Sequence, residues 1–563
     1  MTIQRKVIPA LALFRLVGCE ESAMACINTS LSATDMQGWN STEAEYPRQR
    51  CIHQLFEEQA ARRPDAVAVV HRDRTLSYRE LNRRANQLAR HLRKSGIGND
   101  ALVGICMHRS IELVVAILGV LKAGGTYVAL DPTYPKRRLE TMFEDIDLRI
   151  VLTQNNLLFS LPLHHGRTLC LDSHWPAIAR ESGDNLPGEV SVFNLAYVIF
   201  TSGSTGKPKA AAVVQRGWTN LMHWFATEFK IAPADKVLVI SSFSFDITQR
   251  SIVMPLITGG ELHLLGSDMF DPALVCNTVA EKKITLMNCA PSMFYLLIED
   301  ADRLTLEKLR SLRVLFLGGE AIAASRLRHW AQAPQCTTAV ANVYGIAECT
   351  DVSSFYTLVD YDRYAVSSVP IGKPIHNTQI HILDETLAPV PFGEIGEICI
   401  AGDGVGKGYI NDAALTARKF VRHPFSRDPE ARLYRTGDLG RLLPDGNLEF
   451  VGRVDHQVKI QGLRIDLGDI EAALRQHPMV REAVVLSGEY GSGDQRLVAY
   501  LVPQLQSSDM IPDVRSFLKD RLPRYMLPAE FTLLAEMPLN PNGKIDRGAL
   551  RNRPLDALPH LPA

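Results

Sequence analysis

The stretch that most constrains this chain runs from Leu195 to Lys209. Its first part, Leu195 to Phe200, is apolar and carries β-branched residues, which predicts a buried strand. Hydroxyls and glycines follow, with two lysines near the end, which predicts a loop after the strand. Backbone amides, hydroxyls and lysines gathered in this way suit a polyphosphate. The candidate contacts are Thr201, Ser202, Gly203, Ser204, Thr205, Gly206, Lys207 and Lys209.

This loop differs from the P-loop of nucleoside triphosphatases. That motif needs a glycine separated by four residues from its Gly-Lys pair, and a serine or threonine after the lysine. Here Thr201 occupies the first of these places and Pro208 the last. For the loop considered alone, a serine- and glycine-rich surface turn without a ligand is an equal alternative.

Length and composition are those of an ordinary globular enzyme with more than one domain. A chain of 563 residues exceeds one compact domain, so two or more are expected. The formal net charge of -1 provides no bulk basicity, so we expect no nucleic-acid partner. The ten cysteines are scattered singly without a zinc-type spacing, which predicts reduced thiols in a cytoplasmic protein.

The first 38 residues differ from the rest of the chain. A short basic segment precedes an apolar run from Val7 to Phe14, and Leu16 to Cys19 is similar to a bacterial lipoprotein cleavage box. Arg15 interrupts the apolar core that an export signal needs, so we interpret residues 1–38 as a poorly ordered leader. No run of 18 or more apolar residues occurs, so we expect no membrane-spanning helix and no membrane partner.

Helix and strand patterns alternate from Trp39 onward. A helix is predicted to begin after Ser77, with Glu80 three residues later completing a capping box. Other helices are expected at Cys51–Arg63 and Ile111–Leu121. Strands are expected at 66–71, 102–107, 195–200, 237–240, 261–265 and 314–317. This alternation indicates layered α/β structure with a largely parallel sheet.

The pattern changes twice in the second half of the chain. After Pro391 short strands and turns predict a small β-rich subdomain, and near Gly452 a charged link precedes a new α+β unit. We therefore predict an α/β fold with a large N-terminal domain of layered subdomains and a small C-terminal domain. The predicted boundaries are 1–38 for the leader, 39–454 for the large core, 455–553 for the small domain and 554–563 for a tail.

Four further motifs, together with the loop, resemble those of the adenylate-forming superfamily. They are Asn342–Glu348, Tyr434–Asp438, Gly452–Gly462 and Asn540–Asp546. The resemblance covers residues 39–553, and within the superfamily the chain resembles the adenylation domains of non-ribosomal peptide synthetases. It implies ATP-dependent activation of an amino acid to an aminoacyl adenylate with release of pyrophosphate. Transfer to the phosphopantetheine thiol of a carrier protein would follow.

This resemblance assigns ATP and AMP to the loop and to residues of the other motifs. Asn342 would hydrogen-bond the adenine edge and Tyr344 would stack on its face. Asp438 would accept hydrogen bonds from both ribose hydroxyls, a role that suits an acceptor-only carboxylate. Arg453 would lie near the phosphates or the ribose. The remaining expected contacts are Gly319, Glu320, Val343, Gly345 and Phe450.

Glu348 would hold Mg²⁺, because a hard cation prefers a carboxylate and phosphate oxygens. Next to it the chain departs from the family, which usually has Pro-Thr where this chain has Ile346-Ala347. The threonine hydroxyl normally lies near the α-phosphate, and its loss would remove ~1–3 kcal/mol of transition-state stabilisation. We therefore expect slower activation, not its absence.

Two lysines are expected to serve the two half-reactions. Lys544 would bridge the substrate carboxylate and the α-phosphate, which repel one another. The small domain would then rotate about Asp455, withdraw Lys544 and bring Lys459 to the site. The alternative for Lys544 is a solvated surface lysine, the usual place of this residue type.

Asp246 points to an amino acid as the substrate. In the family an aspartate here pairs with the α-ammonium group, and a buried carboxylate needs such a cation. The alternative is a helix N-cap. The resemblance also gives the expected lining of the substrate pocket as Phe245, Ile247, Arg250, Asn288, Phe316, Gly318, Val343, Asp351 and Val352.

Arg250, Asn288 and Asp351 make this expected wall polar, which predicts a substrate with a polar or charged side chain. Arg250 and Asp351 could instead pair with each other and leave a neutral pocket, so the sign of the charge stays open.

Partners follow from the same resemblance. No carrier-domain pattern follows Arg553, so we expect a peptidyl carrier protein to be loaded in trans, and a small MbtH-like activator protein is a further candidate. One rival function is an acyl- or aryl-CoA ligase, which Asp246 disfavours. Another is a non-catalytic nucleotide-binding scaffold, suggested by Ile346-Ala347 and disfavoured by Lys544, Asp438 and Glu348.

Overall fold

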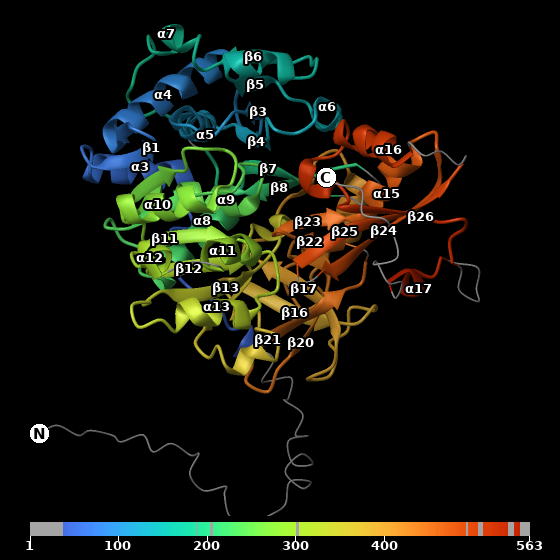
Figure 1. Ribbon diagram of the computed structural model, residues 1–563. Helices are drawn as coiled ribbons and strands as arrows, with labels where there is room; N and C mark the ends of the chain where they lie inside the picture. The colour runs from blue at the N-terminus through green and yellow to red at the C-terminus, as the bar shows by residue number, and fades with distance from the viewer. Residues whose placement is uncertain are drawn as a thin grey trace, which may run out of the picture.

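The chain is described here from a computed structural model, shown in Figure 1. The residues described are 38–188, 190–202, 207–299, 303–455, 457–490, 494–504, 510–538 and 545–551. The predicted leader (except Gly38) and the predicted tail lie outside these residues. The C-terminal elements, orange to red in Figure 1, lie beside the sheets formed by the rest of the chain.

One sheet has seven strands in the order β18-β8-β7-β4-β3-β5-β6. The five strands from β7 to β6 are parallel, and β8 runs antiparallel to β7. The bounds are β3 Leu102–Cys106, β4 Thr126–Leu130, β5 Ile150–Thr153, β6 Arg167–Cys170, β7 Leu195–Thr201, β8 Lys209–Val214 and β18 Gly408–Tyr409. The predicted loop connects β7 to β8, at the carboxyl end of a parallel strand.

A second sheet has nine strands in the order β15-β14-β13-β12-β11-β9-β10-β1-β2. Its central strands, from β13 to β1, are parallel. The bounds are β1 Val67–His71, β2 Arg74–Ser77, β9 Lys236–Val239, β10 Glu261–Leu264, β11 Leu286–Cys289, β12 Val314–Gly318, β13 Ala339–Tyr344, β14 Ser354–Leu358 and β15 Lys373–Pro374.

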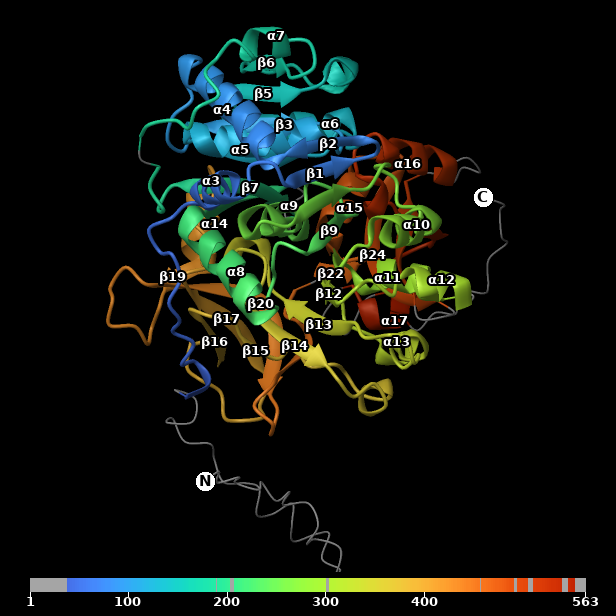
Figure 2. The same cartoon turned by 90° about the vertical axis from the view of Figure 1, so that its left-hand side faces the viewer.

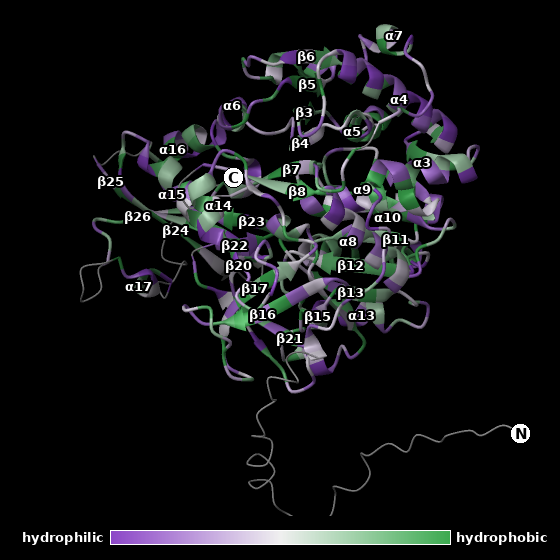
Figure 3. Cartoon of the chain, turned by 180° about the vertical axis from the view of Figure 1, so that it is seen from behind, coloured by the Kyte–Doolittle hydropathy of each residue, from purple (hydrophilic) through white to green (hydrophobic). Residues whose placement is uncertain are grey.

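Helices pack between the two sheets and form the largest core (Figure 2). Those packed in this core are α3 Ile52–Arg62, α4 Tyr78–Lys94, α5 Ile111–Ala123, α8 Gln215–Glu228 and α9 Asp246–Thr258. The Ser77 hydroxyl accepts a hydrogen bond from the Glu80 N–H at 3.3 Å, as the capping pattern predicts. The α4 ribbon is largely hydrophilic in Figure 3 because the helix is rich in charged and amide side chains.

Other helices cover the outer faces of the two sheets. α6 Lys136–Asp145 packs on the seven-stranded sheet through Leu139, Met142 and Phe143. The nine-stranded sheet is covered by α10 Pro272–Lys282, α11 Pro291–Ile298, α12 Arg303–Lys308 and α13 Ala324–Ala331. The remaining short helices of this region are η1 Asn155–Ser160, α7 Trp175–Ile178, η2 Ala347–Cys349 and η3 Arg363–Ala365.

The predicted β-rich subdomain and α+β C-terminal unit are both present. The five-stranded sheet of the first comprises β16 Thr378–Leu383, β17 Gly396–Gly402, β19 Phe420–Arg422, β20 Arg432–Leu442 and β21 Leu448–Arg453, next to α14 Ala413–Lys419. The second comprises β22 Gln457–Ile460, β23 Leu463–Asp466, α15 Leu467–Arg475, β24 Val480–Tyr490, β25 Asp494–Pro503, α16 Met510–Lys519, η4 Arg524–Met526, β26 Glu530–Leu533 and α17 Arg547–Arg551. The α/β class with a large and a small domain is therefore confirmed. Across the described ranges, no helix has both the length and the apolar character needed to span a bilayer.

A buried ion pair fixes α5 against α3 inside the largest core. The Lys122 side chain is 1% exposed, and its ammonium group pairs with the Glu57 carboxylate. The ammonium also lies 5.8 Å from the centre of the Phe56 ring. Burial lowers the pKa of Lys122 from 10.5 to about 8, although Glu57 opposes this shift.

We predict that this lysine makes the stability of the protein rise with pH between about 8 and 10.5. In this range the folded state has lost the Lys122 proton while the unfolded chain still binds it, so raising the pH favours folding. A shift of this size corresponds to roughly 3 kcal/mol at about 1.4 kcal/mol per pKa unit. Thermal unfolding midpoints of the wild type should therefore rise with pH relative to those of Lys122→Met. The exposed, ion-paired Lys94 provides the control Lys94→Met, and a pH-independent difference for Lys122→Met would contradict the prediction.

Candidate active site

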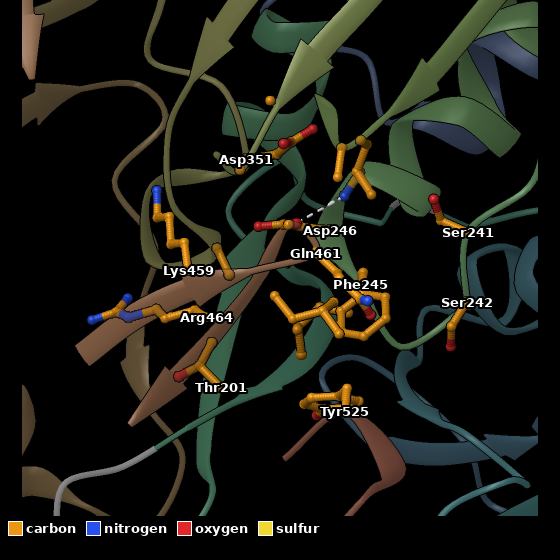
Figure 4. Close-up of a pocket in the computed structure, with 18 of the residues that line it drawn as sticks. Thr201, Ser241, Ser242, Phe245, Asp246, Asp351, Lys459, Gln461, Arg464 and Tyr525 are labelled. Atoms are coloured by element: carbon orange, nitrogen blue, oxygen red, sulfur yellow. Dashed lines mark hydrogen bonds between the residues drawn. The ribbon is translucent and has the colours of Figure 1, made fainter. Parts of the chain in front are cut away.

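A cavity of about 400 Å³ lies between the carboxyl ends of the parallel strands and the small domain (Figure 4). Large-domain residues on its wall come from the ends of β7, β12 and β13 and from the start of α9. The small domain contributes the turn of the hairpin β22–β23 and Tyr525. Ligand sites in α/β proteins are commonly found at this edge of a sheet.

The start of the predicted phosphate loop reaches this cavity. Thr201 and Ser202 line it, and the Ser202 hydroxyl donates to the Arg464 carbonyl at 2.8 Å. Lys207 is exposed, whereas burial lowers the pKa of Lys209. The predicted contacts Gly203, Ser204, Thr205 and Gly206 lie outside the described residues.

Asp246 is the first residue of α9, and its carboxylate faces the cavity (Figure 4). It accepts a hydrogen bond from the Ile247 N–H at 2.8 Å. The N-cap is Phe245, so the alternative interpretation of Asp246 as the cap is wrong. Burial raises the pKa of the Asp246 carboxyl, and within the described ranges no cation pairs with it.

Arg250 and Asp351 both line the cavity, and the Arg250 guanidinium pairs with the Asp351 carboxylate at 2.7 Å. The Arg250 side chain is 1% exposed, donates to Asn288 Oδ1 at 3.1 Å and lies over the Phe225 ring. Burial raises the pKa of Asp351 to about 7 although Arg250 opposes the shift. The pairing that the sequence left open is therefore present, and it makes the wall polar without a net charge.

A close backbone approach at Gly345 positions this carboxylate. Asp351 has a φ of +69°, and a Cβ added at Gly345 would lie 1.6 Å from the Asp351 carbonyl oxygen. Only glycine fits there.

Two of the predicted pocket residues lie behind the cavity wall. Phe316 is fully buried against Phe225 and Phe229, and Asn288 reaches the cavity only through Arg250. The predicted lining residues that the structure does bring to the cavity are Phe245, Asp246, Ile247, Arg250, Gly318, Val343, Asp351 and Val352.

The residues predicted to hold the adenosine form one connected cluster. Tyr344 donates its hydroxyl hydrogen bond to Asp438 at 2.6 Å, and Arg453 pairs with the other oxygen of this fully buried carboxylate. Arg453 also pairs with Asp455, at 2.7 Å. Burial alone would raise the pKa of Asp455, but the hydrogen bonds from Arg453 lower it.

Other predicted nucleotide contacts have different surroundings. The Asn342 amide donates to the Pro370 carbonyl at 2.8 Å, and Phe450 is partly buried. Gly319, Val343 and Gly345 line the cavity, next to the buried apolar residues of the family departure, Ile346 and Ala347.

Glu348 combines complete burial with a negative charge. Its carboxylate accepts from the Tyr409 hydroxyl at 2.8 Å and lies 3.3 Å from the Arg464 guanidinium. Burial would raise the pKa of Glu348, but Arg464 and the Tyr409 hydroxyl outweigh it and lower the pKa. In the part of the chain described here no three acidic, His or Cys side chains gather around a metal position. One carboxylate shared with substrate phosphates is nevertheless a usual arrangement for Mg²⁺, so Glu348 fits the predicted role.

The hairpin β22–β23 brings Lys459 to the cavity. Its ammonium group lies 5.4 Å from the centre of the Tyr344 ring, and burial lowers its pKa. The Gly462 N–H donates to the Glu320 carboxylate at 2.8 Å, which fastens the turn to the large domain. A Cβ at Gly319 would lie 2.9 Å from the Gly462 carbonyl oxygen, so a glycine permits this approach. Lys544, the other predicted catalytic lysine, lies outside the described residues.

The sequence analysis missed Arg464 and Tyr525, which both line the cavity. Arg464 pairs directly across the hairpin from Lys459. The sequence carries a signal for this hairpin, because Gly462 follows Gln461 and glycine is favoured in two-residue hairpin turns. In the structure both residues of this turn have positive φ values, as such a turn requires. No local signal points to Tyr525, which approaches from a distant segment.

Comparison with known proteins agrees with this geometry. A family model described as AMP-binding enzyme matches residues 56–410, and a model of the AMP-binding enzyme C-terminal domain matches residues 469–544. The chain belongs to the AMP-binding enzyme family. The expectation of an adenylate-forming enzyme is confirmed with it.

Sequence relatives in this family include several peptide synthases. Tyrocidine synthase 1 of Brevibacillus parabrevis is 42% identical over 515 residues, covering 91% of this chain and 46% of that protein. Tyrocidine synthase 3 of the same organism is 41% identical over 514 residues, covering 91% of this chain and 8% of that protein. The chain thus spans less than half of either relative.

Solved structures of AMP-binding family members have the same fold. NpsA-ThdA, an artificially fused adenylation–PCP di-domain from Klebsiella oxytoca, gives a TM-score of 0.77 at 27% identity. That match covers 86% of this chain and 94% of the other. Holo-PA1221, a peptide synthetase protein with adenylation and PCP domains, gives 0.78 at 29% identity, covering 89% and 84%. The predicted resemblance to adenylation domains is confirmed.

We predict strong energetic coupling between Arg250 and Asp351. Either Arg250→Leu or Asp351→Leu leaves a buried charge without its partner, at a cost of roughly 3–5 kcal/mol. The double variant removes both charges, so it should lose far less stability than the sum of the single variants. Chemical denaturation at pH 8 measures the three differences. The exposed pair Arg328 and Asp362 serves as control with coupling near zero, and additivity at Arg250 and Asp351 would contradict the prediction.

Proposed function

We propose that this chain activates an amino acid with ATP to form an aminoacyl adenylate and then transfers the aminoacyl group to a carrier-protein thiol. The observation that carries the proposal is the Asp246 carboxylate, which faces the cavity without a cation partner among the described residues. A buried carboxylate of this kind is complementary to an α-ammonium group.

ATP would lie between the phosphate loop and the cluster around Asp438. Tyr344 and Asn342 would contact the adenine. The Asp438 carboxylate would accept hydrogen bonds from the ribose hydroxyls as well as from Arg453. Mg²⁺ held by Glu348 and the phosphates would neutralise charge on the departing pyrophosphate.

The first reaction needs positioning more than proton transfer. A carboxylate oxygen of the amino acid attacks the α-phosphorus of ATP, and the bond to the pyrophosphate oxygen breaks. The nucleophile is already ionised, so no general base is required. Lys544 would supply the positive charge between the two repelling anions. Ile346 and Ala347 offer no hydroxyl at the cavity wall, which supports the expectation of slow activation.

The second reaction would use the arrangement described above, with the hairpin docked. Arg464 pairs with Glu348 here, so a cation and the hairpin compete for one carboxylate. Once pyrophosphate has left, pairing of Glu348 with Arg464 would favour docking of Lys459. The thiol sulfur then attacks the acyl carbon, the bond from that carbon to the phosphate oxygen breaks so that AMP leaves, and the thiol proton passes to solvent.

The partners of this chain are proposed on the same grounds. Adenylation and PCP domains occur together in the two solved relatives, which supports a peptidyl carrier protein with a phosphopantetheine arm. An MbtH-like activator stays an untested candidate partner.

The cavity favours a substrate with a polar side chain. Arg250 and Asp351 line the cavity and neutralise each other. A side chain that hydrogen-bonds this pair would fit better than an aliphatic one, because buried polar groups need partners.

We predict that amino-acid-dependent ATP–pyrophosphate exchange is highest with polar or charged amino acids. Asp246→Asn should lower this exchange about ten- to a hundredfold, since hydrogen bonds to charged groups contribute roughly 1.5–3 kcal/mol. Dominance of leucine or phenylalanine would refute the substrate class. Exchange with fatty or aryl acids instead would favour a CoA ligase, and tight nucleotide binding without exchange would favour a scaffold.

The two lysines should separate the half-reactions. Lys544→Ala should reduce ATP–pyrophosphate exchange by roughly a hundred- to a thousandfold, because it removes a cation that acts on the barrier. Lys459→Ala should leave exchange within about twofold and slow single-turnover loading of a phosphopantetheinylated carrier. Equal effects of Lys459→Ala on both measurements would count against a role confined to transfer.

A further inference from the structure

A second charged feature lines the cavity, at the end where α6 meets the small domain. Arg138 of α6 is only 8% exposed and lies on the cavity wall. Within the described ranges its Nε has no hydrogen-bond partner, and no carboxylate pairs with its guanidinium. A buried cation without a partner is costly, so the position is suited to an anion that arrives with a ligand.

Both domains build the surroundings of Arg138. Tyr134, just before α6, and Tyr525 of η4 have ring centres 6.5 Å apart, and both line the cavity. α6 and α16 lie side by side in Figures 1 and 2. The site therefore lies between the two domains, and Tyr525 belongs to it only while the small domain is docked as here.

Charges around this opening are mostly positive. Burial lowers the pKa of Arg521, and the nearby exposed Arg137 lowers it further, whereas Asp520 opposes the shift. Arg524 borders a neighbouring cavity that shares Tyr134 and Tyr525. Two acidic groups of the large domain line the neighbouring cavity and have other partners: Asp131 accepts from Thr133 and Ser242, and Asp268 pairs with His108.

We propose that Arg138 binds a phosphate group that enters this end of the cavity. A guanidinium presents two parallel N–H donors that match phosphate oxygens, and it stays charged when buried. The inference rests on the proposed function, whose substrates carry phosphate from two sources. One is the pyrophosphate end of ATP, because Phe200 and Thr201 at the start of the phosphate loop line the same cavity. The other is the phosphate of the pantetheine arm, which would pass between the domains.

Equilibrium binding tests the proposal without any catalytic turnover. Calorimetry would compare pyrophosphate, phosphopantetheine and phosphate-free pantetheine on the wild type, Arg138→Ala and Arg138→Lys. We expect Arg138→Ala to weaken at least one phosphorylated probe about tenfold or more, with pantetheine unchanged. Arg138→Lys should recover part of the loss, because it keeps the charge but loses the paired donors.

The pattern of losses identifies the source of the phosphate. Weaker pyrophosphate binding alone assigns Arg138 to ATP, and weaker phosphopantetheine binding alone assigns it to the carrier arm. Arg137→Ala removes the same charge from the adjacent exposed position and should change neither affinity by more than about twofold, since exposed charges are screened.

Two results would overturn the inference. The first is wild-type affinity for both phosphorylated probes in an Arg138→Ala protein with an unchanged thermal midpoint. The second is no measurable binding of either phosphorylated probe to the wild type. Neither result concerns amino-acid-dependent exchange, so the proposed function can fail or hold independently.

Discussion

The ion pair between Arg464, which lines the cavity, and the buried Glu348 joins the two domains. Glu348 is fully buried, and its charge is tolerated because Arg464 and the Tyr409 hydroxyl surround it. Arg464 lies across the hairpin from Lys459, so the same pair sets the place of that lysine. Contacts from Ser202 and Glu320 to the hairpin backbone complete the docking.

Two carboxylates line the same cavity, and they differ in whether a cation pairs with them. Asp351 pairs with Arg250 on the side-chain wall, whereas Asp246 has no cation partner among the described residues. Burial raises the pKa of both groups, and the pair keeps the wall neutral. Under the proposed function, Asp246 would recognise the α-ammonium group and the Arg250–Asp351 pair would face the substrate side chain.

Local sequence patterns predicted much of the fold correctly. The strand expected at 102–107 is Leu102–Cys106, and the helix expected at Cys51–Arg63 is Ile52–Arg62, because periodicity and end signals act over a few residues. Motif resemblance singled out Asp246, Glu348 and Asp438, and of these Asp246 lines the cavity. It could not separate Phe316, which packs behind the wall, from true lining residues, since both kinds of position follow the same strand pattern.

The sequence by itself determined the class of fold, the family and the candidate chemistry of single residues, since these depend on short motifs. Only the tertiary structure decided which charges neutralise one another. Arg250 and Asp351 are far apart in the chain, and they meet because Gly345 admits the turn that carries Asp351. The tertiary structure also decided the state of Arg138. Packing places Tyr134 and Tyr525 on the same cavity wall, and among the described residues no group accepts a hydrogen bond from Arg138 Nε. Pairing of buried charges is a property of the assembled cavity, and no local pattern encodes it.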